Sequence, residues 1–131
     1  MEDGLSMVEN NNIAQKLSKA QVIPIIVIDD SKKALPLAET LFNSGVTCAE
    51  ITLRTDAALE SLKIFSQFNK FTLGAGTITN IEQLHDAINA GAEFIVSPGF
   101  DESLSTESSK NNILYIPGCV CLLYTSPSPR D

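Results

Sequence analysis

The chain has 131 residues, of which 44% are hydrophobic and 19% charged, and its formal net charge is −7 at pH 7. This composition predicts one globular domain with its own core, and it excludes an intrinsically disordered protein. The negative charge argues against nucleic acid or an anionic membrane as a partner.

The sequence shows no pattern of export, membrane insertion or metal binding. Its first residues, Met1 to Gly4, are acidic where a secretory signal is basic, and its most apolar run, at 22–28, is too short to cross a membrane. We therefore expect a cytoplasmic protein. The three cysteines, Cys48, Cys119 and Cys121, follow no spacing typical of a metal site or a disulfide framework.

Strand-like and helix-like segments alternate along the chain. A first helix is expected at 12–20, and apolar runs then predict strands at 22–28, 48–53, 71–75, 94–96 and 113–116. Helical periodicity lies between the strands, and 102–110 is a short helical or looped connector. We expect Ser31 to cap the helix that Gly45 ends, and Thr79 with Glu82 to form the capping box of the helix that Gly91 ends.

This alternation predicts a parallel sheet covered by helices, either an open doubly wound sheet or a (β/α)₈ barrel. In both folds the chemistry gathers beyond the carboxyl ends of the strands. The residues expected there are Asp29-Asp30, Arg54-Thr55, Gly76-Thr77, Ser97-Pro98-Gly99 and Pro117-Gly118.

Glu50 and Arg54 give the second strand an unusual pattern. Side chains alternate faces along a strand, so Glu50, Thr52 and Arg54 are expected on one face of an otherwise apolar segment. Burying an ionised group costs several kcal/mol unless it is paired. The pattern therefore indicates chemistry, although an edge strand with one solvated face or a structural ion pair also accounts for it.

Two familiar nucleotide and phosphate patterns do not fit. The acidic pair Asp29-Asp30 suggests a phosphorelay receiver domain, but a receiver needs an aspartate after its third strand and a lysine after its fifth, and neither is present. Gly74 and Gly76 lack the third glycine of a dinucleotide fingerprint, so we interpret them as a tight strand-to-helix turn.

The strand ends together resemble the bacterial 2-dehydro-3-deoxy-6-phosphogluconate aldolases, also called 4-hydroxy-2-oxoglutarate aldolases. The resemblance spans about residues 12–118, and it rests on the segments Val22 to Val27, Glu50 to Thr55, Gly74 to Thr77, Ser97 to Gly99 and Ile116 to Gly118. It implies a class I, Schiff-base lyase on a (β/α)₈ TIM barrel, a homotrimer that cleaves a keto sugar acid phosphate to pyruvate and glyceraldehyde 3-phosphate. It implies no metal and no cofactor.

The same resemblance assigns roles to three side chains. It makes Glu50 the general acid/base, and it makes Arg54 and Thr77 the groups that hold the pyruvate carboxylate. Burial raises the pKa of a carboxyl group and a nearby cation lowers it, which suits a proton shuttle at Glu50. His85, the only histidine, is expected in the middle of a helix, away from the strand ends.

The chain departs from this family at the Schiff-base lysine, which the family carries on its sixth strand. No lysine of this sequence is expected to point into a barrel, and Lys32 and Lys33 are expected to be solvated. We therefore expect residues 1–118 to be the front part of an aldolase barrel, truncated to about its first five strands. Residues 119–131 are expected to be a non-native tail, of which 121–131 reads as a translated sequencing adapter.

Two other functions stay open. A non-catalytic α/β module would bind a small keto acid or phosphate through Arg54 and Thr77 alone, and a receiver-like signalling domain is a weaker alternative. Between the possible keto acids, the ending Leu53-Arg54-Thr55 resembles the phosphogluconate branch of the family more than its galactonate relatives.

Overall fold

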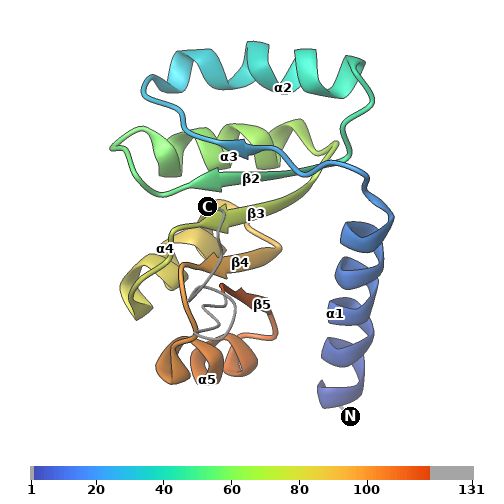
Figure 1. Cartoon of the computed structure of the whole chain (residues 1–131), viewed down its shortest axis with the longest axis vertical. Coiled ribbons are helices and arrows are strands. Elements are labelled where there is room, and N and C mark those ends of the chain that lie inside the picture. The colour runs from blue at the N-terminus through green and yellow to red at the C-terminus, as the bar shows by residue number, and fades with distance from the viewer. Residues whose placement is uncertain (1, 119–131) are drawn as a thin grey trace, which may run out of the picture.

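The computed structural model describes the backbone of residues 2–118 and the side chains of residues 10–118, so the predicted tail lies outside the described residues. Strands and helices alternate through this range (Figure 1). The strands are β1 (Ile25–Ile26), β2 (Cys48–Thr52), β3 (Thr72–Gly76), β4 (Phe94–Ser97) and β5 (Leu114–Pro117). The helices are α1 (Glu2–Lys19), α2 (Ala34–Asn43), α3 (Ala58–Phe68), α4 (Ile81–Ala90) and α5 (Glu102–Lys110), and the 3₁₀ turn η1 (Ser31–Lys33) directly precedes α2.

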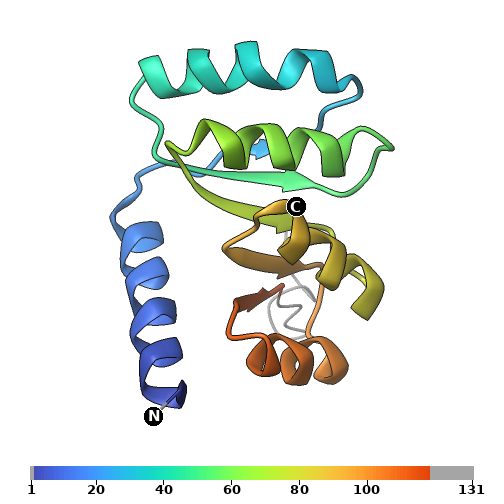
Figure 2. The same cartoon turned by 180° about the vertical axis from the view of Figure 1, so that it is seen from behind.

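The strands form one parallel sheet in the order β1-β2-β3-β4-β5. Each strand lies beside the next one in the sequence, whereas a doubly wound sheet reverses its order partway. Helices α2 to α5 share one core with the same face of the sheet and wrap around it (Figures 1 and 2). This is the arrangement of a (β/α)₈ barrel, and it excludes the doubly wound sheet that a receiver-like domain requires.

The strand register defines the face of the sheet that points away from these helices. Register partners in a parallel sheet point to the same face, and one row of partners crosses all five strands: Ile25, Glu50, Gly74, Phe94 and Leu114. We call this the inner face. The alternate residues, such as Ile51 and Ile95, are fully buried in the core beneath the helices.

The inner face is closed in its middle and open at β1. Glu50 and Phe94 are 8% and 1% exposed, whereas Ile25 and Val27 are 68% and 55% exposed. Among the described strands, β1 pairs only with β2, so its other edge is free. An apolar pair on this edge therefore faces solvent.

The first helix lies at the end of the sheet where the strands begin, away from the arrowheads (Figures 1 and 2). The thiol of Cys48, at the start of β2, contacts the carbonyl oxygen of Lys16 at 3.8 Å. The helix predicted at 12–20 is thus confirmed, although α1 already begins at Glu2.

The first strand is much shorter than the predicted 22–28. Only Ile25 and Ile26 pair with β2, and Pro24, which has no N–H to donate, contributes its carbonyl oxygen to Glu50 N at 3.0 Å. The continuous apolar run predicted a strand buried on both faces. Here the alternate residues Ile26 and Ile28 are buried, whereas Ile25 and Val27 are exposed.

Two predicted helix starts are each displaced by one residue. Asp30, not Ser31, accepts a hydrogen bond from Lys32 N at 3.0 Å and caps η1. At α4 the cap is Asn80, whose side chain accepts from Gln83 N at 2.8 Å, while Gln83 Oε1 accepts from Thr79 N at 2.7 Å. Gly91 ends α4 in the left-handed conformation with φ 108°, as predicted.

Candidate functional site

Glu50 lies in the middle of β2 on the inner face, and a glycine makes room for it. A Cβ atom at Gly76 would lie 1.8 Å from Glu50 Oε2 and 2.7 Å from Glu50 Cδ. The carboxyl group therefore rests against the bare backbone of β3, where any side chain would displace it. Gly76 is required by this close approach, which is one of the main uses of glycine in a strand.

Gly74 has a parallel role on the same strand. A Cβ atom there would lie 2.1 Å from Cε2 of the Phe94 ring, which crosses β3 from β4. The interpretation of Gly74 and Gly76 as a strand-to-helix turn is therefore wrong. Both lie inside β3, and their missing side chains leave space on the inner face for Glu50 and Phe94.

The environment of Glu50 favours its protonated form. Burial raises the pKa of the Glu50 carboxyl group above its ordinary value, and the positive charge of Arg54 opposes that rise. Within the described residues the carboxyl group forms no ion pair or hydrogen bond. A buried, unpaired carboxyl group with a raised pKa is suited to both giving and accepting a proton.

Arg54 is not on the strand, so the predicted buried face with two opposite charges is wrong. β2 ends at Thr52, the N–H of Leu53 still donates to Gly76 O at 2.9 Å, and the chain then turns away from the sheet. Arg54 is exposed in this turn. The Arg54 charge still acts on the pKa of Glu50, but it does so from the turn after β2 and not from a buried position in the strand.

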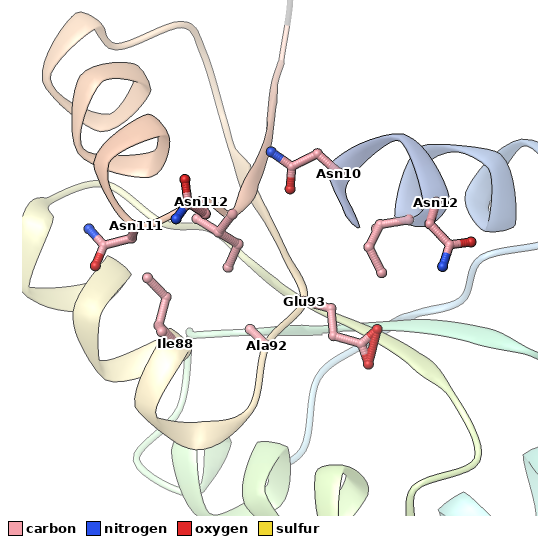
Figure 3. A pocket seen from close by; sticks show the side chains of 9 residues that line it. Asn10, Asn12, Ile88, Ala92, Glu93, Asn111 and Asn112 are labelled. Carbon is pink, nitrogen blue, oxygen red and sulfur yellow. The ribbon is translucent and has the colours of Figure 1, made fainter. Parts of the chain in front are cut away.

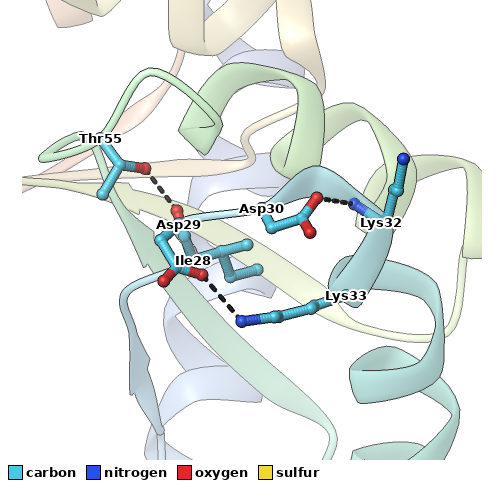
Figure 4. Close-up of polar contacts among 6 residues, drawn as sticks. All are labelled: Ile28, Asp29, Asp30, Lys32, Lys33 and Thr55. Atoms are coloured by element: carbon cyan, nitrogen blue, oxygen red, sulfur yellow. Dashed lines mark hydrogen bonds and ion pairs between the residues drawn. The ribbon is translucent and has the colours of Figure 1, made fainter.

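The turn that carries Arg54 is tied to the loop after β1. The Thr55 hydroxyl donates a hydrogen bond to the carbonyl oxygen of Ile28 (Figure 4). In the same loop, Lys33 Nζ and Asp29 Oδ1 form an ion pair at 3.2 Å, with the two side chains 66% and 77% exposed. Lys33 is therefore solvated, as predicted, and its ion-pair partner is Asp29.

Thr77 follows β3 with a backbone conformation that is rare for its residue type. Its φ is 59°, in the left-handed region that β-branched residues avoid. The bonds on either side hold it there, because Gly76 O accepts from Leu53 N and Ile78 N donates to Val96 O at 3.1 Å. Such strained residues cluster at active sites and ligand clamps, so Thr77 is a strong candidate for a binding role.

A hydrogen-bonded group lies after β4 that no sequence pattern indicated. Tyr115 of β5 places its hydroxyl 2.7 Å from Ser97 Oγ, and the same hydroxyl accepts from Asp101 N at 3.1 Å. Ser97 Oγ is also 2.6 Å from Gly99 O. These bonds fix the loop between β4 and α5 beside Ile78, at the carboxyl ends of the strands. A tyrosine within a short apolar strand gives no indication, in the sequence alone, that its hydroxyl holds a neighbouring loop.

Other candidate features lie elsewhere or do not form. His85 pairs with Glu107 between α4 and α5, at 3.0 Å, so it has the helix-packing position predicted for it. Within residues 10–118, no three His, Cys, Asp or Glu side chains gather as metal ligands would. No helix of the described chain is long and apolar enough to span a membrane.

The sequence matches the family model described as KDPG and KHG aldolase over residues 13–123, which is most of the chain. The chain belongs to this aldolase family. Among curated relatives, it is 43% identical to the 2-dehydro-3-deoxy-phosphogluconate aldolase of Pseudoalteromonas atlantica, over 77% of this chain and 47% of the relative. It is 40% identical to the aldolase of the same name from Dickeya dadantii, over 79% of this chain and 49% of the relative.

Solved structures of the family have the same fold. One is a Legionella pneumophila KDPG aldolase with pyruvate captured as a covalent carbinolamine intermediate, with a TM-score of 0.74, 41% identity, and coverage of 79% of this chain and 51% of that one. The Zymomonas mobilis enzyme with 3-phosphoglycerate has a TM-score of 0.79 and 37% identity, covering 85% of this chain and 53% of that one. This aldolase chain thus spans about half the length of the curated relatives it matches.

Proposed function

We propose that residues 1–118 supply the first part of a Schiff-base aldolase. The substrate is 2-dehydro-3-deoxy-6-phosphogluconate, cleaved to pyruvate and glyceraldehyde 3-phosphate, and/or 4-hydroxy-2-oxoglutarate, cleaved to pyruvate and glyoxylate. The observation that carries the proposal is the buried Glu50 carboxyl group, seated against Gly76 on the inner face with a raised pKa. Membership of the aldolase family supports the reaction class.

Glu50 is assigned the proton transfers of the reaction. Forming and breaking an imine passes through a carbinolamine, which must lose and regain water, and the pyruvate enamine must be protonated. One group has to give and accept protons in these steps, and its pKa should lie near the working pH. Burial raises the pKa of the Glu50 carboxyl group, which moves it in the direction that this role requires.

Arg54 and Thr77 are assigned to the carboxylate of the keto acid. A planar guanidinium matches a carboxylate with two parallel hydrogen bonds, and the exposed position of Arg54 leaves it free to meet a ligand entering from solvent. Thr77 adds a hydroxyl donor at the adjacent strand end, on a backbone held in its strained conformation.

The imine itself requires a lysine that this chain does not place on the inner face. Every lysine lies in a helix, a 3₁₀ turn or a loop: Lys16, Lys19, Lys32, Lys33, Lys63, Lys70 and Lys110. We therefore propose that the 131-residue chain alone is inactive, and that 119–131 is a non-native tail. The nucleotide sequence of the gene tests the second point. For the whole enzyme we expect a homotrimer in the cytoplasm, by family relation.

A chimera tests the function directly. Residues 12–118 would be joined to the second half of the Dickeya dadantii relative, which completes the barrel. Aldol cleavage is then followed as pyruvate release with each of the two substrates. Glu50→Gln should lower kcat by roughly 10²- to 10⁴-fold, the usual cost of losing a general acid/base. Arg54→Ala should chiefly raise KM, because it removes a charged partner of the substrate.

Glu93→Gln is the matched control in the same chimera. Burial also raises the pKa of Glu93, but this residue precedes β4 at the other end of the strands. It should retain the parent kcat. Equal losses in the two variants would reject the assignment of Glu50. Pyruvate binding without cleavage by either parent substrate would instead favour the non-catalytic binding module.

A further inference from the structure

The end of the sheet where the strands begin carries a hollow of about 550 Å³ that the proposed function does not use. Its walls come from the last turns of α1, from the connection between α3 and β3, and from the starts of β2 and β3. Three lysines line it, Lys16, Lys19 and Lys70, and among the described residues Glu93 is the only acidic one there. The hollow is therefore cationic on a chain whose net charge is −7.

The three lysines reach the hollow from two elements of the fold. Lys16 and Lys19 lie three residues apart on α1, which places them on one side of the helix, and the Cys48 thiol contact to Lys16 O fixes that turn over the start of β2. Lys70 comes from a different element, and its ammonium group lies 5.8 Å from the centre of the Phe42 ring. Two segments far apart in sequence thus contribute lysines to one hollow.

These charges lack partners within the described residues. None of the three lysines has a carboxylate within 4.0 Å there, since the ion pairs found in the described chain are Lys33 with Asp29 and His85 with Glu107. Glu93 is near enough to Lys16 for that charge to act on its pKa, but the two form no ion pair. Like charges that converge without partners favour a bound counter-ion.

Backbone donors and a hydroxyl group line the same hollow. In the described chain, the N–H groups of Lys70 and Phe71 form no hydrogen bond, since backbone pairing of this segment begins with Thr72 N to Thr47 O at 2.8 Å. The Thr72 side chain also lines the space. Backbone N–H groups without a partner and lysine ammonium groups are both donors that acidic oxygens accept from.

Figure 3 shows the neighbouring hollow, which shares Glu93 and is lined by asparagines of α1 and of the turn between α5 and β5. No lysine or arginine of residues 10–118 lines that space, so the described positive charge lies on the other side of Glu93. Glu93 separates an amide-lined hollow from a cationic one.

We propose that the lysine-lined hollow binds a small molecule bearing two or more acidic oxygens, of the phosphate or polycarboxylate kind. The site lies at the opposite end of the strands from Arg54 and Thr77, so it is separate from the proposed keto-acid site and does not rest on it. A simpler account is that lysines stabilise the C-terminal ends of α1 and α3. That account explains the positive charge of the lysines. It does not explain why two separate elements contribute lysines to the same hollow.

The test is a titration of the purified 131-residue chain with pyrophosphate at low ionic strength, followed by calorimetry and by backbone amide NMR. We expect saturable binding at one site, with shifts centred on the amides of Lys70, Phe71 and Thr72. Lys16→Gln and Lys70→Gln should each weaken binding about 5-fold, the scale of one partly exposed charge pair. Glu93→Gln should tighten binding, because it removes the carboxyl group that the described residues place in the hollow.

Lys63→Gln is the matched control, because Lys63 is an exposed lysine on α3 outside the hollow. It should bind pyrophosphate as tightly as the parent chain. Citrate in place of pyrophosphate separates a polycarboxylate from a phosphate ligand by relative affinity. The proposal is overturned by the absence of saturable binding, by equal weakening in Lys63→Gln, or by hollow variants that lose stability while keeping the parent affinity.

Discussion

The close approach of the Glu50 carboxyl group to Gly76 predicts that a side chain at position 76 lowers the stability of the chain. In Gly76→Ala the new methyl carbon would overlap the Glu50 carboxyl group, at 1.8 Å from Oε2. The φ of Gly76 is not in the left-handed region, so the change adds no backbone strain and isolates the collision. Because Glu50 is only 8% exposed, its side chain has little free space to enter. We expect the free energy of unfolding to fall by about 1 to 3 kcal/mol, the usual cost of overpacking.

A double-mutant cycle assigns that loss to the carboxyl group. In a Glu50→Ala background the space opposite position 76 is empty, so Gly76→Ala should be neutral or stabilising by about 0.4 to 1 kcal/mol through its effect on the unfolded chain. Gly99→Ala is the control, since a Cβ atom there meets nothing within 4 Å. Urea unfolding followed by far-UV circular dichroism measures all four variants. An equal loss from Gly76→Ala in both backgrounds would refute the proposed seating of Glu50.

Three further predictions concern the same chain. Burial raises the pKa of Glu50 above 4.5, so the contribution of this carboxyl group to stability is fully present below that pH and is lost as the pH rises through the raised value. Glu50→Gln should therefore gain stability relative to the parent with rising pH. Parallel pH profiles of the two proteins in urea melts would contradict this. After incubation with pyruvate and borohydride, intact-mass measurement should show no stoichiometric adduct, because Lys32 and Lys33 are exposed and so lack the desolvation that activates a lysine as a nucleophile. A single-site adduct would show that a lysine of this chain forms the imine. Tyr115→Phe should cost about 0.5 to 1.5 kcal/mol, because it removes the hydroxyl that bonds Ser97 Oγ and Asp101 N, while Ser97 Oγ keeps its bond to Gly99 O. An unchanged urea midpoint would show that this hydroxyl does not hold the loop.

The general architecture could be read from the sequence because it depends on periodicity. Each predicted helix and strand exists, and the connector at 102–110 is a helix with the predicted bounds. The bounds of β1 could not be read in this way. The apolar run at 22–28 shows only that these residues are suited to burial on both faces. The length of the strand depends on its hydrogen-bond pairing, and this depends on which strands lie beside it.

The candidate site was predictable only in part. The alternation of faces correctly placed Glu50 among buried residues, because its position in the middle of β2 follows from the strand period. The same rule failed for Arg54, since alternation holds only while the chain stays in the sheet, and β2 ends two residues earlier. The roles of Gly76 and Tyr115 depend on contacts between strands, which no local pattern encodes. The assigned roles of Glu50, Arg54 and Thr77 stay predictions.

The free edge of β1 also bears on how the chain behaves in concentrated solution. An unpaired strand edge with apolar side chains is a template for pairing with another molecule, and it is a common origin of aggregation. Here the edge strand has only two paired residues, and Pro24 interrupts the donors directly before it. Both features shorten the segment that a second molecule could extend. Ile25→Lys should therefore be a solubilising change that leaves the core beneath the helices intact, since Ile25 does not belong to that core.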